Sequence, residues 1–203
     1  MAPSENDAGI IWLESADSTN SELRRRMGGL DNLSVIAAQS QSAGRGQGSH
    51  SWFSTPGKNL TFSMLLRYGD SLEVRDMLLV TCVAALGVRD YLRTHGVEAR
   101  IKWPNDVWVG DRKICGILIE NILDGSRIRE SIVGFGLNLN ESGWPEELPN
   151  PVSLYELTGK QYDIMEELPR LTKEICRRFG QLAFSDGRKS LQEEFGACMF
   201  RLP

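Results

Sequence analysis

Residues 100–120 read RIKWPNDVWVGDRKICGILIE, and their pattern predicts the type of sheet in this protein. Runs that alternate apolar with polar residues, or are almost wholly apolar, lie within it and just after it, at Arg100–Trp103, Val107–Val109, Ile114–Ile119 and Ser131–Leu139. Gly110 and Asp111 supply a turn between the second and third runs. Short runs around a glycine turn are typical of a β-hairpin, so we predict a mainly antiparallel or mixed sheet here.

The residues before this hairpin predict further strands and one helix. Short β-rich runs bounded by Ser, Asn and Gly lie at Ile10–Glu14, Ser34–Ala38 and Leu60–Leu66. Apolar residues at helical spacing predict a helix over Val74–Thr94. Asp70 and Glu73 are placed to open it as a capping box, and Gly96 is placed to close it.

The last third of the chain has the pattern of a helix. One apolar stripe consists of Leu168, Leu171, Ile175, Phe179 and Leu182. Asp163 and Glu166 form a candidate cap pair, and Pro169 marks the start of this helix or a kink in it. Strands with interspersed helices, but no strict βαβ alternation, predict an α+β fold in which a mixed, mainly antiparallel sheet packs with helices. We expect residues 1–203 to form one domain.

The composition excludes several classes of protein. Of 203 residues, 41% are hydrophobic and 25% charged, as in globular domains, and the apolar runs are far shorter than the roughly 20 residues that span a bilayer. The N-terminus has acidic residues and no basic region, so it does not read as a secretory signal, and we expect a cytoplasmic protein. Cys82, Cys115, Cys176 and Cys198 match no zinc spacing or disulfide framework, and we expect reduced core thiols.

The charge is unevenly distributed along the chain. With 23 basic and 27 acidic side chains the net charge is −4, which argues against a nucleic-acid partner. Residues 32–69 contain no Asp or Glu but include Arg45, Lys58 and Arg67. In an acidic chain such a segment suits an anionic ligand, although a Gly/Ser-rich surface loop that merely lacks acids would look the same.

The glycine-rich loop, residues 41–54, reads QSAGRGQGSHSWFS. Alternating glycines let the backbone approach a ligand closely, and Arg45 adds a forked cation, so the pattern favours anion binding. It is neither a P-loop nor a dinucleotide fingerprint, and a flexible turn would have a similar composition. Trp52 could stack on a purine or be half-buried core. His50, without a paired acid, is expected to be exposed to solvent.

Lys102 lies in a predicted strand that Pro104 ends or confines to an edge. We expect Trp103 to face the core, so that Lys102 faces the opposite side, where its ammonium could neutralise a carboxylate and a phosphate. An ordinary exposed lysine is the alternative. Further along, Gly116 indicates a bulge or the close approach of a ligand. The amide of Asn138 could form hydrogen bonds with the edge of an adenine, or it could cap the end of a strand.

Taken together, these motifs resemble biotin protein ligases, also called biotin–acetyl-CoA-carboxylase ligases. The match in order and spacing extends over residues 10–140 and rests on S18-T-N20, Q41-S-A-G-R-G46, W52, K102-W-P-N-D106, R112-K-x-x-G-I-L-I-E120 and G134-x-G-x-N138. The resemblance implies an α+β catalytic domain similar to those of lipoate protein ligases and class II aminoacyl-tRNA synthetases.

The resemblance also implies an activity. The family forms biotinyl-5′-AMP from biotin and ATP, releases pyrophosphate, and transfers the biotinyl group to a lysine of a biotin carboxyl carrier domain. Mg²⁺ is expected with ATP, but no sequence feature identifies its protein ligands. A homodimer is compatible with the sequence, because an interface strand and an exposed edge look alike in a single chain.

Site residues carried over from the family fall into three groups. The catalytic group is Lys102, which matches the family's essential lysine, and Arg45. The residues expected to bind biotin or its adenylate are Ser18, Thr19, Asn20, Gln41, Arg45, Gly46, Gln47, Lys102 and Gly116. The residues expected to contact the nucleotide are Trp52, which would pack on adenine, and Asn138, which would contact the adenine edge.

The sequence departs from the family pattern in three places. Gln47 stands where the family's loop has a second arginine that helps to retain the adenylate. Only nine residues precede the first predicted strand, so we expect no N-terminal helix-turn-helix and no direct DNA contact. The chain stops at Pro203, and we expect the family's small C-terminal β-barrel to be absent or truncated.

Two other functions remain open at this stage. A lipoate or octanoate ligase would share the fold but need an alkyl tunnel in place of a polar pocket. A non-catalytic protein that binds biotin or its adenylate would keep the pocket without the chemistry. Release of pyrophosphate with biotin and ATP would separate an enzyme from a binder.

Overall fold

The computed structural model describes residues 9–69 and 71–200. Within them one mixed sheet has the strand order β1-β2-β3-β7-β6-β5-β4. The strands are β1 (Ile10–Ala16), β2 (Val35–Gln41), β3 (Leu60–Arg67), β4 (Arg100–Lys102), β5 (Asp106–Val109), β6 (Arg112–Asp124) and β7 (Arg127–Leu137). The β1–β2 pair is parallel and the other neighbours are antiparallel. The predicted α+β fold with a mainly antiparallel sheet is therefore confirmed.

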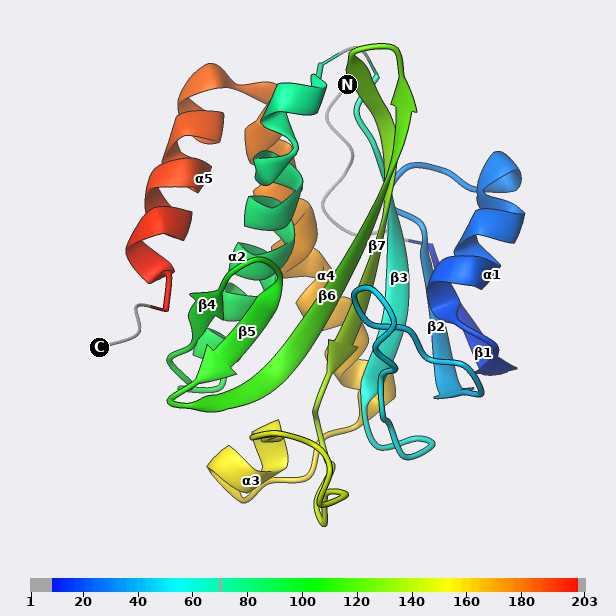
Figure 1. Ribbon diagram of the computed structural model, residues 1–203, viewed down its shortest axis with the longest axis vertical. Helices are drawn as coiled ribbons and strands as arrows, with labels where there is room; N and C mark the ends of the chain where they lie inside the picture. The colour runs from blue at the N-terminus through cyan, green and yellow to red at the C-terminus, as the bar shows by residue number, and fades with distance from the viewer. Residues whose placement is uncertain (1–8, 70, 201–203) are drawn as a thin grey trace.

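Helices cover both faces of this sheet (Figure 1). On one face lie α2 (Leu78–Thr94), α4 (Ile164–Gly180) and α5 (Ser185–Cys198), and on the other lies α1 (Thr19–Arg26). The short α3 (Leu154–Thr158) follows β7 at one end of the sheet. Within the described residues no helix combines the length and the apolar character needed to cross a bilayer.

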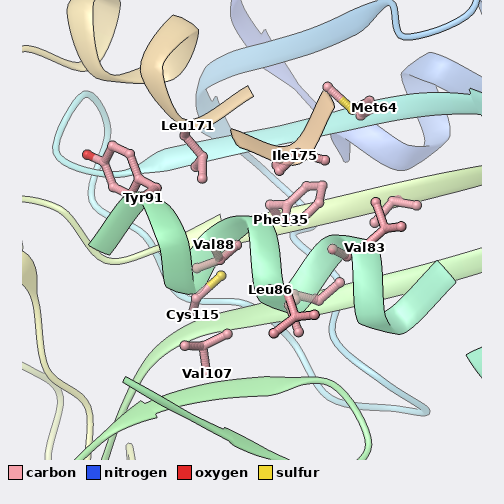
Figure 2. Packing of buried hydrophobic residues seen from close by; sticks show 14 of the residues in the cluster. Met64, Val83, Leu86, Val88, Tyr91, Val107, Cys115, Phe135, Leu171 and Ile175 are labelled. Carbon is pink, nitrogen blue, oxygen red and sulfur yellow. The ribbon is translucent and has the colours of Figure 1, made fainter. Parts of the chain in front are cut away.

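The main apolar core lies between the sheet and the α2 face. Figure 2 shows side chains of α2 and α4 meeting those of the strands, among them Leu86, Ile175 and Phe135. All three are at most 4% exposed. A Cβ on Gly87 of α2 would lie 2.8 Å from the Ile175 Cα, so only glycine lets the two helices approach this closely.

The α1 face has a much smaller core. Leu23 of α1 packs with Ile36, Leu65 and Ile132, which alternate along their strands with residues of the main core. The helix α1 was not predicted, because Leu23 is its only large apolar residue and three arginines follow it. Tertiary contact with the sheet, more than amphipathic patterning, defines this helix.

The helix ends differ in detail from the sequence predictions. A 3-10 turn, Val74–Asp76, precedes α2, and the Asp76 carboxylate accepts a hydrogen bond from the Glu73 N–H. Asp70, the predicted partner, lies outside the described residues. Gly96 follows the end of α2 with φ +75°, as a stop signal should.

In α4, the prediction that Pro169 marks the helix start is wrong, because the proline lies inside the helix. The Asp163 carboxylate caps the helix six residues earlier by accepting a hydrogen bond from the Met165 N–H. The four cysteines are free, as expected. Cys82 and Cys115 are buried, and Cys176 and Cys198 are half-buried.

Candidate active site

A cavity of about 530 Å³ opens on the α1 face of the sheet. Its floor is formed by β6 and β7, and its walls come from the start of α1, the glycine-rich loop and the β4–β5 hairpin. In Figure 1 the connection from β2 to β3, which contains the loop, lies on the same side of the sheet as α1. The cavity brings together segments that are far apart in the sequence.

Glycines in β6 and β7 create the room for this cavity. A Cβ on Gly134 would lie 2.2 Å from Asn20 Oδ1, and a Cβ on Gly136 would lie 2.2 Å from the Trp52 ring. A Cβ on Gly116 would lie 2.8 Å from the same ring. Any larger residue at these positions would displace Asn20 or Trp52. At Gly116 the close neighbour is the Trp52 ring, so the predicted close approach of a ligand stays a prediction.

One end of the cavity is lined by neutral polar groups. Ser18, Thr19 and Asn20 lie at the start of α1 and are nearly fully buried. The Thr19 N–H donates to Gln41 Oε1 at 2.8 Å, so β2 positions the start of the helix. The Ser63 hydroxyl lies 2.8 Å from Thr19 Oγ1 and 2.5 Å from Asn20 Oδ1. This end can donate and accept hydrogen bonds toward a neutral polar ligand.

The glycine-rich loop folds as a small hairpin beside the cavity. The Gly46 N–H donates to the His50 carbonyl at 2.7 Å and the Trp52 N–H donates to the Gly44 carbonyl at 2.9 Å. A Cβ on Gly44 would lie 2.7 Å from the Trp52 carbonyl oxygen, which explains this glycine. The cavity is lined by several residues of this loop, among them Arg45, Gly46, Gln47, His50 and Trp52. His50 is exposed to solvent, as expected.

The acid-free segment is balanced by carboxylates from elsewhere in the chain. Arg45 pairs with Glu120 at 3.2 Å, Lys58 with Glu141 at 3.5 Å and Arg67 with Glu130 at 2.7 Å. Of the three cations only Arg45 is among the residues that line the cavity. Of the predicted anion-binding segment, only Arg45 is therefore placed to contact an anion in the cavity.

The other end of the cavity is cationic and aromatic. Lys102 Nζ lies 3.9 Å from the centroid of the Trp108 ring. Lys113 Nζ lies 2.7 Å from Asp106 Oδ1 and 5.6 Å from the centroid of the Trp52 ring. The indole Nε1 atoms of Trp52 and Trp108 are buried without a hydrogen-bond partner. Two ammonium groups meet at this end of the cavity, and both can serve an anionic ligand.

The prediction that Trp103 faces the core is wrong. Trp103 is 59% exposed, and the buried residue is Ile101. Because β4 ends at Lys102, strand alternation does not extend to Trp103. Lys102 lies on the side of the strand opposite Ile101 and lines the cavity. Lys102 therefore faces away from the core, as predicted, although the prediction for Trp103 on which this rested is wrong.

Sequence reasoning missed Lys113 and Trp108. Simple alternation along a strand places residues 113 and 116 on opposite faces. In the structure the β5–β6 register shifts, so that Trp108 pairs with Lys113 while Val107 pairs with Cys115. Ile114 becomes the extra residue of a bulge, and Lys113 and Gly116 share the cavity. Ser63 was missed as well, and its polar type inside an apolar strand was the available signal.

Asn138 is the one predicted site residue that is not among those lining the cavity. It is 3% exposed, and its Nδ2 donates to the carbonyls of Val152 at 3.0 Å and Lys113 at 3.3 Å. In this arrangement it supports the backbone around Lys113, so the predicted contact with an adenine edge stays a prediction.

Comparisons with known proteins show which family this chain resembles. Residues 12–138 match the model of the biotin/lipoate A/B protein ligase family. The bifunctional ligase/repressor BirA of Bacillus subtilis is 33% identical over 132 residues, 64% of this chain and 40% of that protein. The biotin–[acetyl-CoA-carboxylase] ligase of Paracoccus denitrificans is 34% identical over 180 residues, 84% of this chain and 72% of that protein.

A solved structure agrees with these sequence matches. The biotin protein ligase of Aquifex aeolicus in complex with biotin and ATP superposes with a TM-score of 0.79 at 30% identity, and the match covers 95% of this chain and 79% of that one. This chain spans 40% of the length of BirA and 72% of the Paracoccus ligase.

Proposed function

Because this chain belongs to the biotin/lipoate A/B protein ligase family and, within it, to the biotin protein ligases, we propose that it forms biotinyl-5′-AMP and transfers biotin to a carrier protein. The acceptor would be a lysine of a biotin carboxyl carrier domain. The observation that carries the proposal is one cavity whose neutral polar end adjoins a cationic end. Biotin has the matching shape, a polar ring at one end and a carboxylate at the other.

The polar end suits the ureido ring of biotin. A ureido group has two N–H donors and one carbonyl acceptor, so it needs both kinds of partner. Asn20 Oδ1 and the hydroxyls of Ser18 and Thr19 supply acceptors, and the hydroxyls and the amide of Gln41 also supply donors. A buried ring with each of these groups satisfied binds specifically, because an analogue lacking them leaves polar groups unpaired.

The cationic end suits the first reaction. A carboxylate oxygen of biotin attacks the α-phosphorus of ATP, the bond to the β-phosphate oxygen breaks, and pyrophosphate leaves. Two unit negative charges 4 Å apart repel by about 4 kcal/mol at an effective dielectric constant of 20. Lys102 and Lys113, held on strands, would lower this barrier by neutralising charge where the two anions converge. Arg45 would cover the acyl-phosphate from the loop.

The second reaction needs no further ionised group from the cavity. The neutral amine of the carrier lysine attacks the carbonyl carbon of the adenylate, AMP leaves with the bonding electrons, and the amine proton goes to solvent. The glycine-rich loop would keep water from the mixed anhydride until the carrier arrives.

Trp52 would pack on the adenine of ATP through its ring, which borders the cavity at Gly116 and Gly136. Mg²⁺ would accompany the nucleotide. The described residues contain no group of three His, Cys, Asp or Glu side chains suited to hold a metal ion, and Asp106 is the carboxylate that lines the cavity. Mg²⁺ binds through one or two carboxylates plus substrate phosphates, so Asp106 fits as its protein ligand.

The experiment measures pyrophosphate release by the purified chain with ATP and Mg²⁺, in the presence of biotin, lipoate or octanoate. We expect release that depends on biotin, and labelled biotin on the lysine of an added carrier domain. Release with lipoate or octanoate instead would identify the rival ligase of the same fold. Binding of biotin without pyrophosphate release would identify a non-catalytic binder.

A further inference from the structure

Glu120 of β6 joins two walls of the cavity without lining it. Its Oε2 accepts hydrogen bonds from Asn20 Nδ2 at 3.0 Å and from Arg45 Nη2 at 3.2 Å. Arg24 Nη2 lies 3.8 Å from the same oxygen. Asn20 belongs to the polar end and Arg45 to the glycine-rich loop, so a single carboxylate oxygen connects the two.

The ion pair attaches the first arm of the loop hairpin to the sheet. Hydrogen bonds between Gly46 and His50 and between Trp52 and Gly44 close the hairpin on itself and do not tie it to the body. Trp52 anchors the second arm by packing on the glycine floor of β6 and β7. Backbone hydrogen bonds from the Ser42 and Ala43 N–H groups to the Ala16 and Asp17 carbonyls hold the base of the first arm. Arg45, paired with Glu120, adds a side-chain anchor beyond that base, although its side chain is 43% exposed.

The same carboxylate fixes the orientation of the Asn20 amide. An ionised carboxylate only accepts hydrogen bonds, so Asn20 must present Nδ2 to Glu120, and the Leu118 carbonyl accepts a second, longer hydrogen bond from the same Nδ2 at 3.4 Å. Its Oδ1 then lies 2.5 Å from the Ser63 hydroxyl, against Gly134 on the cavity floor. An acceptor at that place is what a ring N–H requires.

We propose that Glu120 is a positioning residue of the biotin site, acting through Asn20 and Arg45 rather than on the substrate itself. This inference rests on the proposed function for the identity of the ligand. The part that concerns the loop does not, because the Glu120–Arg45 pair involves no ligand group.

The experiment compares amide hydrogen exchange in the ligand-free wild type, Glu120→Gln and a matched control, Glu130→Gln. Glu130 is 23% exposed, against 24% for Glu120, and pairs with Arg67, which does not line the cavity. Loss of a partly exposed ion pair should speed exchange in residues 44–52 by about threefold to fivefold. We expect this faster exchange in Glu120→Gln and not in the control Glu130→Gln, and we expect the melting temperature of Glu120→Gln to be unchanged.

Arg45→Gln breaks the same pair from the loop side, so it keeps the test decisive if Glu120→Gln folds poorly. In Glu120→Gln/Arg45→Gln the exchange should be no faster than in Arg45→Gln. Unchanged exchange in residues 44–52 in both single variants, or independent effects that multiply in the double variant, would overturn the role of Glu120 in the loop.

Calorimetric titration with biotin addresses the other half of the proposal. Glu120→Gln should weaken biotin binding about tenfold, while Glu130→Gln should not, because only the former removes the closer of the two acceptor-only groups that orient the Asn20 amide. Equal affinities for wild type and Glu120→Gln would contradict this half. If the wild type binds no biotin, the proposed function fails, and the exchange comparison still decides whether Glu120 positions the loop.

Discussion

The two faces of the sheet differ in how closely side chains pack on them. The face under α2 and α4 is filled with large buried side chains such as Phe62, Met64 and Phe135. The opposite face buries a four-residue cluster around Leu23 and is hollowed by glycines at 116, 134 and 136. Close packing supplies stability on the first face, and a cavity with unused polar groups supplies binding on the second. Changes to one face should therefore alter stability, and changes to the other should alter chemistry.

Leu171→Ala should give the largest effect on the helix face. Leu171 is fully buried in the main core, and such truncations lower the free energy of unfolding by about 2–5 kcal/mol. Chemical denaturation measures the loss, and Leu123→Ala, at a 52% exposed position, is the control. The adenylation rate per folded molecule should stay unchanged. A large fall in that rate would break the division between the faces.

Lys102→Ala should give the converse result on the cavity face. Removal of one preorganised charged group typically costs about 10²- to 10³-fold in rate, while truncation of a side chain outside the core leaves stability unchanged. Biotin-dependent pyrophosphate release and the melting temperature are the two measurements. A variant that retains more than about half of the wild-type rate, with an unchanged melting temperature, would refute the role of Lys102. Lys113→Ala tests whether the second lysine shares it.

Gln47→Arg should slow the dissociation of biotinyl-AMP about tenfold. A charge-assisted hydrogen bond contributes about 1.5–3 kcal/mol, against about 1 kcal/mol for a neutral one. Gln47 lines the cavity, so an arginine there adds a cation beside the phosphate. Dissociation rates of both proteins at two ionic strengths check this, because salt should reduce the difference. Identical rates at low salt would show that charge at this position does not retain the adenylate.

Glu141→Gln should reveal a pH-dependent contribution of this buried carboxylate to stability. Burial alone would raise the pKa of the Glu141 carboxyl, but hydrogen bonds from Thr55 and Asn59 outweigh burial and hold this pKa below its usual value of 4.5. A lowered folded-state pKa stabilises the protein above the unfolded-state value, and this stabilisation is lost as the pH falls through the folded-state value.

The measurement is the melting temperature of wild type and Glu141→Gln between pH 3 and about pH 6. The difference between them should be constant above about pH 4.5 and shrink below it. The difference between wild type and Leu171→Ala should not follow this curve, because no charge is involved. A Glu141→Gln difference that grows as the pH falls would have the wrong sign for this account.

Periodicity predicted most of the sheet, and motifs predicted ten of the 24 residues that line the cavity. Runs such as Leu60–Leu66 and Ile114–Ile119 indicate strands because successive side chains of a strand point to opposite faces of the sheet. The glycine-rich loop and the segment around Lys102 carry recognisable residues at fixed spacing. These features are local, so a single sequence is sufficient to predict them.

Features that depend on distant contacts could not be predicted in this way. The bulge at Ile114, which turns Lys113 into the cavity, arises from the β5–β6 register. The helix α1 owes its existence to packing of Leu23 on the sheet. The carboxylate that pairs with Arg45 lies 75 residues away, at Glu120. Each of these depends on which segments meet, and composition or periodicity carries no signal for that.

The division between the faces is tested most directly by hydrogen exchange across the whole chain, with and without biotin, ATP and Mg²⁺. Ligands should slow exchange at residues 18–20, in the glycine-rich loop and along the glycine-bearing parts of β6 and β7. Ordering of the loop should give the largest change, because its glycines lose most conformational freedom when they close over the adenylate. Exchange in α2, α4 and α5 should not change beyond global stabilisation by the ligand. Protection that appears chiefly in those three helices, or a loop whose exchange does not slow, would contradict the account.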